Sequence, residues 1–389
     1  MPPPPVAGPA TDGSISTVKR ILILGIGSAQ VDALRWCRTA GFEVHACGMS
    51  EQGAGRSLVE RFLKADIRDG DAVEQYAREN RIDVVYSVGS DVAMPTVALV
   101  SERLGLPCFF PHESAATCGN KVLMRRALGP DFAGNVAHRL ARSLEEAEAW
   151  DTFPCVMKPV DNQGQRGVFT IRERSEMREF FRRSLQFSPG GGVILEEYAD
   201  GSEVSANTYV VDGKVRFTEV TDRAVFEDYP GGIVREHRIP SSASAAEQQA
   251  VRDLVGRVLD RIRVPNGPVY FQAKLTDRGP VLLEMTPRLD GCHLWRLIRE
   301  YCSVDLLECT FRHLLGDPLP SLEETTPGRP LVLRFPSAAP GTEVDHESLK
   351  PGRSLFLEWY YGQGEKVRPI NGYMEKVGYL IAEPEGTGG

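Results

Sequence analysis

The stretch VLLEMTPR (Val281–Arg288) places oxygen-bearing and basic side chains at alternate positions. Side chains on a β-strand alternate between two faces, so Glu284, Thr286 and Arg288 would project together. The preceding VYFQAKL and the turn TDRG predict a hairpin in which Gln272 faces Glu284, although a slip of one residue would separate the two. Such oxygens on rigid strands suit Mg²⁺, and the arginine could neutralise a phosphoryl group. The alternative is a strand that leaves the core and meets water.

A second set of residues could bind an anion. Lys158 ends the apolar strand FPCVMKP, and a polar loop follows it. Gly164 and Gly167 in this loop free the backbone to turn its N–H groups toward a phosphate. Lys121, in GNKV, begins a helix. The alternative interpretation is a surface loop with two solvated lysines.

Acidic residues end the strand GVILEEYA. Glu196, Glu197 and Tyr198 close it, and Glu203 lies seven residues after Glu196. A strand end followed by a short linker could offer backbone groups to a flat heterocycle and a carboxylate to ribose hydroxyls. An acidic linker between domains is the alternative.

The bulk composition limits the classes of function. The chain has 389 residues, 42% of them hydrophobic and 25% charged, and a net charge of −8 with the signs interspersed. This balance argues against a nucleic-acid surface or a membrane patch and favours small-molecule partners. Eight cysteines without a CxxC pair indicate reduced thiols in a cytoplasmic protein. No apolar run approaches the ~20 residues needed to span a bilayer.

The pattern of elements predicts several parts. Residues 1–19 are rich in proline, lack a signal-peptide pattern and are expected to form a disordered leader. Alternating strands and helices over 20–112, ending with a strand at LPCFF, predict a parallel doubly wound sheet. Two hairpins predict an α+β module over 113–315, with subdomains that meet near residue 195. Residues 316–389 look like a small β-rich appendage.

The turn GIGSAQ invites comparison with the dinucleotide-binding fingerprint. Gln30 stands where the third glycine is required, and CGMS follows the second strand where an acidic residue should lie. The chain also lacks a GxxxxGK[ST] phosphate loop. A structural turn is therefore favoured, and a nicotinamide-dependent oxidoreductase becomes the weaker hypothesis.

The order of these parts resembles the ATP-grasp enzymes, closest to their carbamoyl-phosphate-synthetase-like members and to the carboxylate–amine ligases built on that plan. The similarity spans roughly residues 20–315, through GNK, MKP with its glycine loop, LEEY with Glu203, and Q…LLEMTPR. It implies an ATP-grasp fold of α/β and α+β parts. A parallel pre-ATP-grasp domain would precede two subdomains that clamp ATP.

The resemblance also implies roles for individual residues. Those expected to contact ATP are Lys121 and Lys158 at the phosphates, Gly164, Gln165, Arg166 and Gly167 in a mobile flap, Glu196, Glu197 and Tyr198 at adenine, and Glu203 at ribose. Those expected at the reacting centre are Gln272, Glu284 and Thr286 as ligands of one or two Mg²⁺ ions, which Mn²⁺ could replace. The expected catalytic residues are Arg288, at the phosphoryl group, and Lys158. The family usually has asparagine where this chain has Thr286, so the second metal site is less secure.

The segment GGIVREHRIPS adds basic residues near the place where family members contact substrate or phosphate. Arg235, His237 and Arg238 are candidates for this role. A surface histidine is the alternative interpretation of His237.

The function implied is ATP-dependent activation of a carboxylate as an acyl phosphate, followed by attack of an amine, with amino acids as candidate substrates. The alternatives are a carboxylase or carbamoyl-phosphate-forming relative and a regulatory protein that binds ATP without turnover. The first is disfavoured because no biotin-carrier motif or glutaminase domain is visible. A homodimer is a family-level expectation only.

Overall fold

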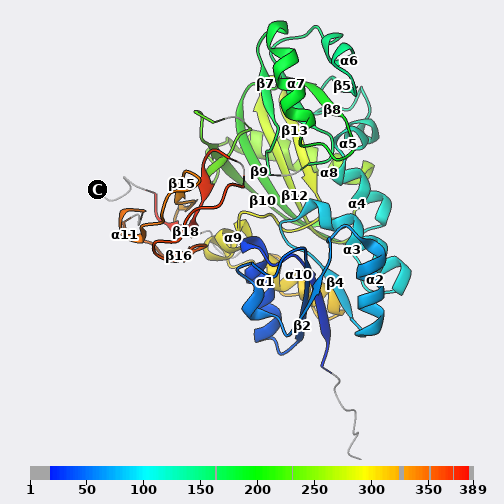
Figure 1. Cartoon of the computed structure of the whole chain (residues 1–389), viewed down its shortest axis with the longest axis vertical. Coiled ribbons are helices and arrows are strands. Elements are labelled where there is room, and N and C mark those ends of the chain that lie inside the picture. Colours follow the sequence, from blue (N-terminus) through cyan, green and yellow to red (C-terminus); the bar gives the residue numbers. More distant parts are fainter. Residues whose placement is uncertain are drawn as a thin grey trace, which may run out of the picture.

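The computed structural model describes residues 18–162, 164–229, 231–323, 328–349, 352–370 and 372–384. The leader predicted from the sequence lies almost wholly outside these residues. An N-terminal domain, a central sheet and a lid follow one another along the longest axis of the molecule (Figure 1). Among the described helices, none is both long and apolar enough to cross a lipid bilayer.

The N-terminal domain is a parallel sheet of four strands in the order β3-β2-β1-β4. Its strands are β1 (Arg20–Leu24), β2 (Glu43–Gly48), β3 (Arg61–Lys64) and β4 (Val84–Tyr86). Its helices are α1 (Ser28–Thr39), η1 (Arg56–Leu58), α2 (Gly70–Glu79), η2 (Asp91–Ala93) and α3 (Met94–Leu104). The doubly wound pattern predicted from the sequence is therefore confirmed.

One predicted strand of this domain is wrong. LPCFF forms no strand; instead Phe109 and Phe110 pack into the core as irregular chain. Pro107 lies within the segment and Pro111 follows it directly, and proline has no N–H to complete a strand ladder. The short strand β3 was not predicted, because only two of its four residues, Phe62 and Leu63, are apolar.

Two helices lead from the N-terminal domain to the lid. They are α4 (His112–Gly119) and α5 (Lys121–Leu128), and the side chain of Asn120 caps α5 by accepting hydrogen bonds from the N–H groups of Val122 and Leu123. The lid is an antiparallel sheet in the order β5-β8-β6-β7. Its elements are β5 (His138–Ala141), α6 (Leu144–Glu148), β6 (Cys155–Pro159), β7 (Phe169–Ile171), η3 (Arg174–Glu176), α7 (Met177–Leu185) and β8 (Val193–Glu197). The lid has an apolar core of its own.

The central sheet has eight strands in the order β13-β12-β9-β10-β11-β14-β18-β16. Its strands are β9 (Ser202–Val211), β10 (Lys214–Val225), β11 (Val234–Ile239), β12 (Gly267–Thr276), β13 (Gly279–Thr286), β14 (Leu331–Arg334), β16 (Phe356–Trp359) and β18 (Gly378–Ala382). The helices that accompany it are α8 (Ala245–Arg261), α9 (Leu294–Cys302) and α10 (Leu306–Leu315). Both predicted hairpins, β9–β10 and β12–β13, are present.

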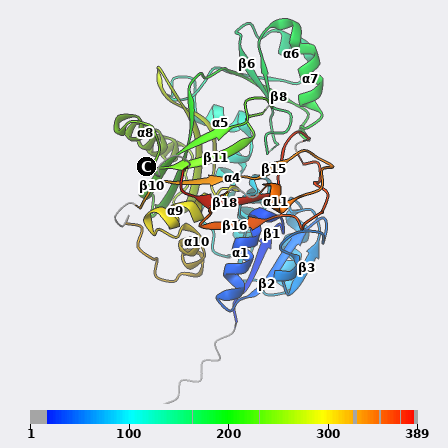
Figure 2. The ribbon, with the colours of Figure 1, turned by 90° about the vertical axis from the view of Figure 1, so that its left-hand side faces the viewer.

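The C-terminal region is β-rich, as expected, but its long strands extend the central sheet. β14 pairs with β11, and β18 lies between β14 and β16. A separate pair, β15 (Ser337–Ala338) with β17 (Glu375–Lys376), and the helix α11 (His346–Leu349) complete the region. Figure 2 shows β16 and β18 beside the N-terminal domain, next to α1.

The two faces of the central sheet differ in chemistry. One face is apolar: Val204, Phe271 and Leu282 are each at most 1% exposed and belong to the main core. The core includes Val251 and Leu254 of α8, which contacts β9, β10, β12 and β13. Because side chains alternate along a strand, the residues between these apolar positions project to the opposite face.

Candidate active site

The opposite face of the central sheet carries a set of polar side chains, here called the polar face. Strand pairing places Gln272 directly opposite Glu284 and Ser205 on its two neighbouring strands. The register that the sequence left open is thus the one that brings Gln272 to Glu284. The polar face consists of Glu203, Ser205 and Asn207 on β9, Glu219, Thr221 and Arg223 on β10, His237 on β11, Tyr270 and Gln272 on β12, and Glu284 and Thr286 on β13.

Five buried polar atoms of this face lack a hydrogen-bond partner among the described residues. They are Asn207 Nδ2, Thr221 Oγ1, Thr286 Oγ1 and the two ring nitrogens of His237, on residues that are at most 3% exposed. A buried polar group left without a partner costs about 1–3 kcal/mol, so such groups are rare in folded proteins. Five of them on one sheet face indicate a place that is built to meet a polar ligand.

The donors at the β12–β13 end of the polar face suit a hard cation. Glu284 supplies a carboxylate, Gln272 an amide oxygen and Thr286 a hydroxyl with no protein partner. No group of three or more histidines, cysteines, aspartates or glutamates able to hold a metal occurs in the described parts of the chain. A set with one carboxylate and neutral oxygens fits Mg²⁺, which takes few protein ligands and completes its shell with phosphates and water.

Arg288 lies just beyond β13, at the junction with the N-terminal domain. Its side chain is 7% exposed; it forms an ion pair with Asp91 and donates a hydrogen bond to the carbonyl of Leu289 at 2.9 Å. Burial opposes the charge of the guanidinium, but the carboxylates of Asp91 and Glu284 outweigh burial and raise its pKa. The pairing with Asp91 was not predicted, because residues so far apart in sequence are brought together only by the docking of the two domains.

In the lid, Lys158 and Glu196 form an ion pair with Nζ and Oε2 2.6 Å apart. The second oxygen of Glu196 accepts a hydrogen bond from Nε of Arg125 at 2.8 Å. Burial alone would raise the pKa of Glu196, but Arg125 and Lys158 together hold it far below its usual range. Arg125, which is fully buried, also donates to the carbonyl of Leu282 in the central sheet at 2.8 Å.

This arrangement differs from the expectation for Glu196. Both of its carboxylate oxygens accept hydrogen bonds from basic side chains. The side chain of Glu196 therefore orients Lys158 and is not available to contact adenine. Arg125 was not singled out in the sequence. The signal that could have found it is its place in α5, one turn after Lys121 on the same side of the helix.

The flap loop contacts Lys121. The ammonium of Lys121 donates a hydrogen bond to the backbone carbonyl of Asn162 at 2.8 Å, and Arg166 donates to the side chain of Asn162 at 2.9 Å. Gly164 and Gly167 have φ values of 71° and 75°, where glycine is the residue least strained. Lys121 and the glycine loop, which were predicted to act together, therefore lie together.

The remaining candidates at the strand end and on β9 each contact another side chain. Glu203 forms an ion pair with Arg223 and accepts a hydrogen bond from Nε2 of Gln272 at 2.9 Å. Glu197 pairs with Arg278 at 2.7 Å, and the ring of Tyr198 lies under the ammonium of Lys274, 5.2 Å from its centroid.

The basic strand β11 splits across the two faces of the sheet. His237 is fully buried, so the interpretation as a surface histidine is wrong; Arg235 and Arg238 are about half exposed. His237 lies opposite Arg223. Its burial, with the positive charges of Arg223 and Lys376, lowers the pKa of its ring well below the ordinary value and keeps it neutral.

A cavity of about 340 Å³ opens beside the flap. Gln165, Arg166 and Gly167 line one side of it, and Gly372 and Tyr373 of the C-terminal region line the other. Arg183 of α7 donates a hydrogen bond to the hydroxyl of Tyr373 at 3.2 Å. The lid therefore touches the body of the molecule at the edge of the flap.

A family model described as an ATP-grasp domain matches residues 151–294, which include the flap and the β12–β13 hairpin. Residues 151–294 therefore form an ATP-grasp domain. Carnosine synthase 1 of Mus musculus is 25% identical over 74% of this chain and 39% of its own length. The chain spans only 39% to 61% of the length of the four sequence relatives first matched.

Solved structures of other proteins show the same fold. The L-amino acid ligase of Bacillus licheniformis superposes with a TM-score of 0.77 at 19% identity, over 93% of this chain and 92% of that one. The biotin carboxylase domain of the 2-oxoglutarate carboxylase of Hydrogenobacter thermophilus, solved as a dimer with MgADP and bicarbonate, gives 0.74 at 14% identity over 94% and 86%. At these identities the likeness establishes the fold, a parallel α/β sheet followed by antiparallel sheets.

Proposed function

We propose that this ATP-grasp protein is a ligase that uses ATP to activate a carboxylate as an acyl phosphate and joins it to an amine, releasing ADP and phosphate. The observation that carries the proposal is the polar face, where Gln272 and Glu284 lie opposite each other beside the buried, partnerless hydroxyl of Thr286. Amino acids are the proposed substrate class, because ligases of amino acids occur among the relatives and the fold neighbours.

The nucleotide would lie between the lid and the central sheet. Lys158, held in place by Glu196, and Lys121 supply positive charge for the phosphates, and the flap around Gly164 supplies backbone N–H groups. Because the carboxylate of Glu196 is engaged, contacts to adenine are assigned to Glu197 and Tyr198 at the strand end. Glu203 is assigned to the ribose hydroxyls and would exchange one of its present partners for them.

Magnesium, or manganese in its place, would be held by Gln272, Glu284 and Thr286. A metal ion there supplies positive charge that neutralises the phosphate oxygens of the nucleotide. With a threonine as the third ligand, the set favours one firmly held ion over two.

The chemistry requires positioning and charge neutralisation and no covalent protein group. A carboxylate oxygen of the substrate attacks the γ-phosphorus, ADP leaves, and an amine then displaces phosphate from the acyl carbon. Arg288, fixed by Asp91, faces the negative charge that develops on the transferred group. The neutral ring of His237 can exchange hydrogen bonds with a substrate without adding charge, and Arg235 offers a cation at the same strand. The flap would exclude water from the acyl phosphate.

The test is an assay of ADP release with Mg·ATP across panels of carboxylates and amines, with bicarbonate included. Release that depends on both an amine and a carboxylate is expected. Release with bicarbonate alone would favour a carboxylase. Binding of ATP without release for any pair would favour a regulatory ATP-binding protein, the function for which Thr286 in place of asparagine is the supporting feature.

A further inference from the structure

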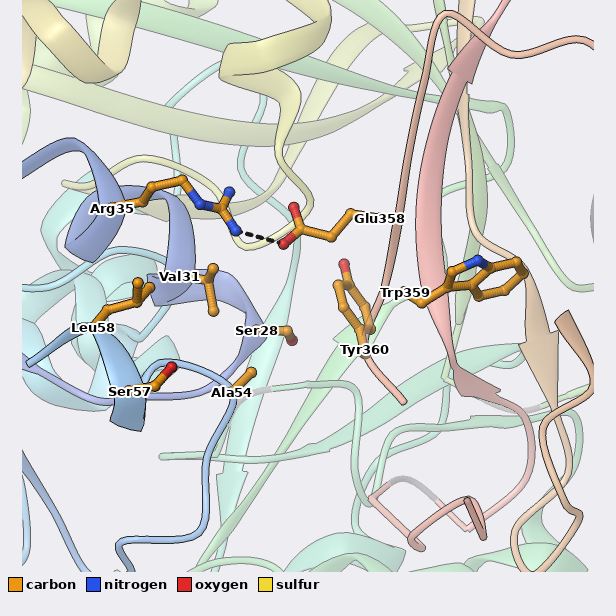
Figure 3. A pocket seen from close by; sticks show the side chains of 9 residues that line it. All are labelled: Ser28, Val31, Arg35, Ala54, Ser57, Leu58, Glu358, Trp359 and Tyr360. Atoms are coloured by element: carbon orange, nitrogen blue, oxygen red, sulfur yellow. Dashed lines mark hydrogen bonds and ion pairs between the residues drawn. The ribbon is translucent and has the colours of Figure 1, made fainter. Parts of the chain in front are cut away.

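A second cavity, of about 190 Å³, lies between α1, the loop before η1 and the end of β16 (Figure 3). None of the polar-face residues lines it. Ser28 and Arg35 border it from α1, Ala54 and Ser57 from the loop and η1, and Glu358 from β16. The cavity has room for about six water molecules at the volume that each takes in the liquid, which is the size of a small metabolite.

The charges on the wall of this cavity are arranged as a complementary pair. Arg35 and Glu358 form an ion pair with NH2 and Oε1 2.9 Å apart, and their side chains are 47% and 23% exposed. A partly exposed pair of this kind contributes at most about 1 kcal/mol, so its separation costs little. Arg35 would stay in place after separation, because its NH1 also pairs with the buried Asp32 at 3.1 Å.

A ligand that carries both charges could insert between the two side chains. Its carboxylate would replace Glu358 on Arg35, and its ammonium would replace Arg35 on Glu358, so neither protein charge loses its partner. The hydroxyls of Ser28 and Ser57 offer further hydrogen bonds, and Val31 and Leu58 offer an apolar wall for a short side chain. A simple anion or cation would satisfy one of the two charges and leave the other without its partner.

We propose that this cavity is a binding site for a small amino acid in its zwitterionic form, separate from the polar face. The site is connected to the reacting centre through His293, which follows Arg288 by five residues. Nδ1 of His293 lies 2.9 Å from Oδ2 of Asp32, and Nε2 lies 2.8 Å from the hydroxyl of Tyr360, another residue of the cavity wall. An amino acid bound here would lie against Tyr360, which holds His293 in the loop that follows Arg288.

Isothermal titration of the full chain with glycine, L-alanine, L-serine and β-alanine tests the proposal. N-acetylglycine and glycinamide, each of which lacks one of the two charges, serve as the matched control ligands. At least one amino acid is expected to bind at least tenfold more tightly than both controls. The titration measures binding and does not depend on turnover. A failure to detect ligase activity would therefore not change its result.

Two variants locate the site. Glu358→Gln removes the partner of the ammonium, and Ala54→Leu narrows the exposed mouth without changing a charge; each is expected to weaken binding at least tenfold. Glu51→Gln, which removes a carboxylate from an exposed pair with Arg56, should leave binding unchanged. If none of the four amino acids binds, the proposal is overturned. Binding that persists in both Glu358→Gln and Ala54→Leu also overturns it, because the amino acid would then be held elsewhere.

Discussion

The buried triad of Arg125, Glu196 and Lys158 gives the sharpest prediction about the lid. Glu196→Gln keeps the shape of the side chain but removes the one negative charge between two cations, and Arg125 has no access to solvent. Removing one partner of a buried ion pair costs about 3–5 kcal/mol, because an uncompensated charge stays behind. The free energy of unfolding should fall by that amount and the melting temperature by about 4–6 °C, since the entropy of unfolding is about 2.1 cal/mol/K per residue. Lys158 also loses its anchor, so the KM for ATP should rise.

The neighbouring Glu197 provides a matched control. It is partly exposed and pairs with the exposed Arg278, so Glu197→Gln should change stability by less than about 1 kcal/mol. Urea unfolding followed by tryptophan fluorescence, to which Trp150 of the lid core contributes, measures both variants. Similar small losses for the two variants would refute the assignment of Glu196 as a buried electrostatic centre.

The pH dependence gives the same prediction a second readout. The pKa of Glu196 is lower in the folded chain than in the unfolded chain, so its contribution to stability is complete above the unfolded value. That contribution is lost as pH falls from about 4.5, the usual pKa of a glutamate, toward the folded value. The difference in stability between wild type and Glu196→Gln should therefore be constant from pH 6 to 8 and shrink below about pH 4.

The remaining predictions concern the polar face. Glu284→Ala should abolish ADP release while the melting temperature changes by only a few degrees. The control Asp277→Asn, in the exposed turn of the same hairpin, should retain activity. Near-normal turnover in Glu284→Ala would refute the assignment of Glu284 as a magnesium ligand. Thr286→Val should lower activity while stability stays equal or rises by about 1 kcal/mol, because it removes a buried hydroxyl that has no protein partner; a loss of stability together with unchanged activity would contradict a ligand role. The neutral, buried His237 should make the protein less stable as pH falls below about 6.5, where the unfolded chain takes up a proton that the native ring does not. His237→Leu should flatten that slope in urea unfolding at pH 5 to 7, and an unchanged slope would show that other groups cause it.

Much of the fold follows from local pattern. The periodicity of apolar residues places the parallel N-terminal strands, and the Asp212–Gly213 turn places the β9–β10 hairpin, since both residues adopt the positive φ that the turn requires. The prediction of a strand at LPCFF is wrong. The segment is apolar enough for a strand, but Pro107 and Pro111 have no backbone N–H group to donate to a neighbouring strand.

The candidate site shows where sequence reasoning ends. Gln272 and Glu284 could be paired because a hairpin sets their register over a few residues. The pairing of Arg288 with Asp91 depends on how two domains dock, and no local pattern encodes it. The alternation Glu203, Ser205, Asn207 on β9 was visible in the sequence, but only the neighbouring strands show that it belongs to the polar face.

The division of the central sheet into an apolar and a polar face has an evolutionary consequence. Because side chains alternate along each strand, a mutation at every second position, such as 205 or 207 on β9, changes the polar face without entering the core formed by Val204 and Ala206. Selection for folding and selection for substrate choice thus act on interleaved but different sets of codons. New specificities can then accumulate one strand position at a time on a scaffold whose stability is preserved. A library randomised only at polar-face positions outside the magnesium set should therefore yield mostly folded proteins with varied preferences.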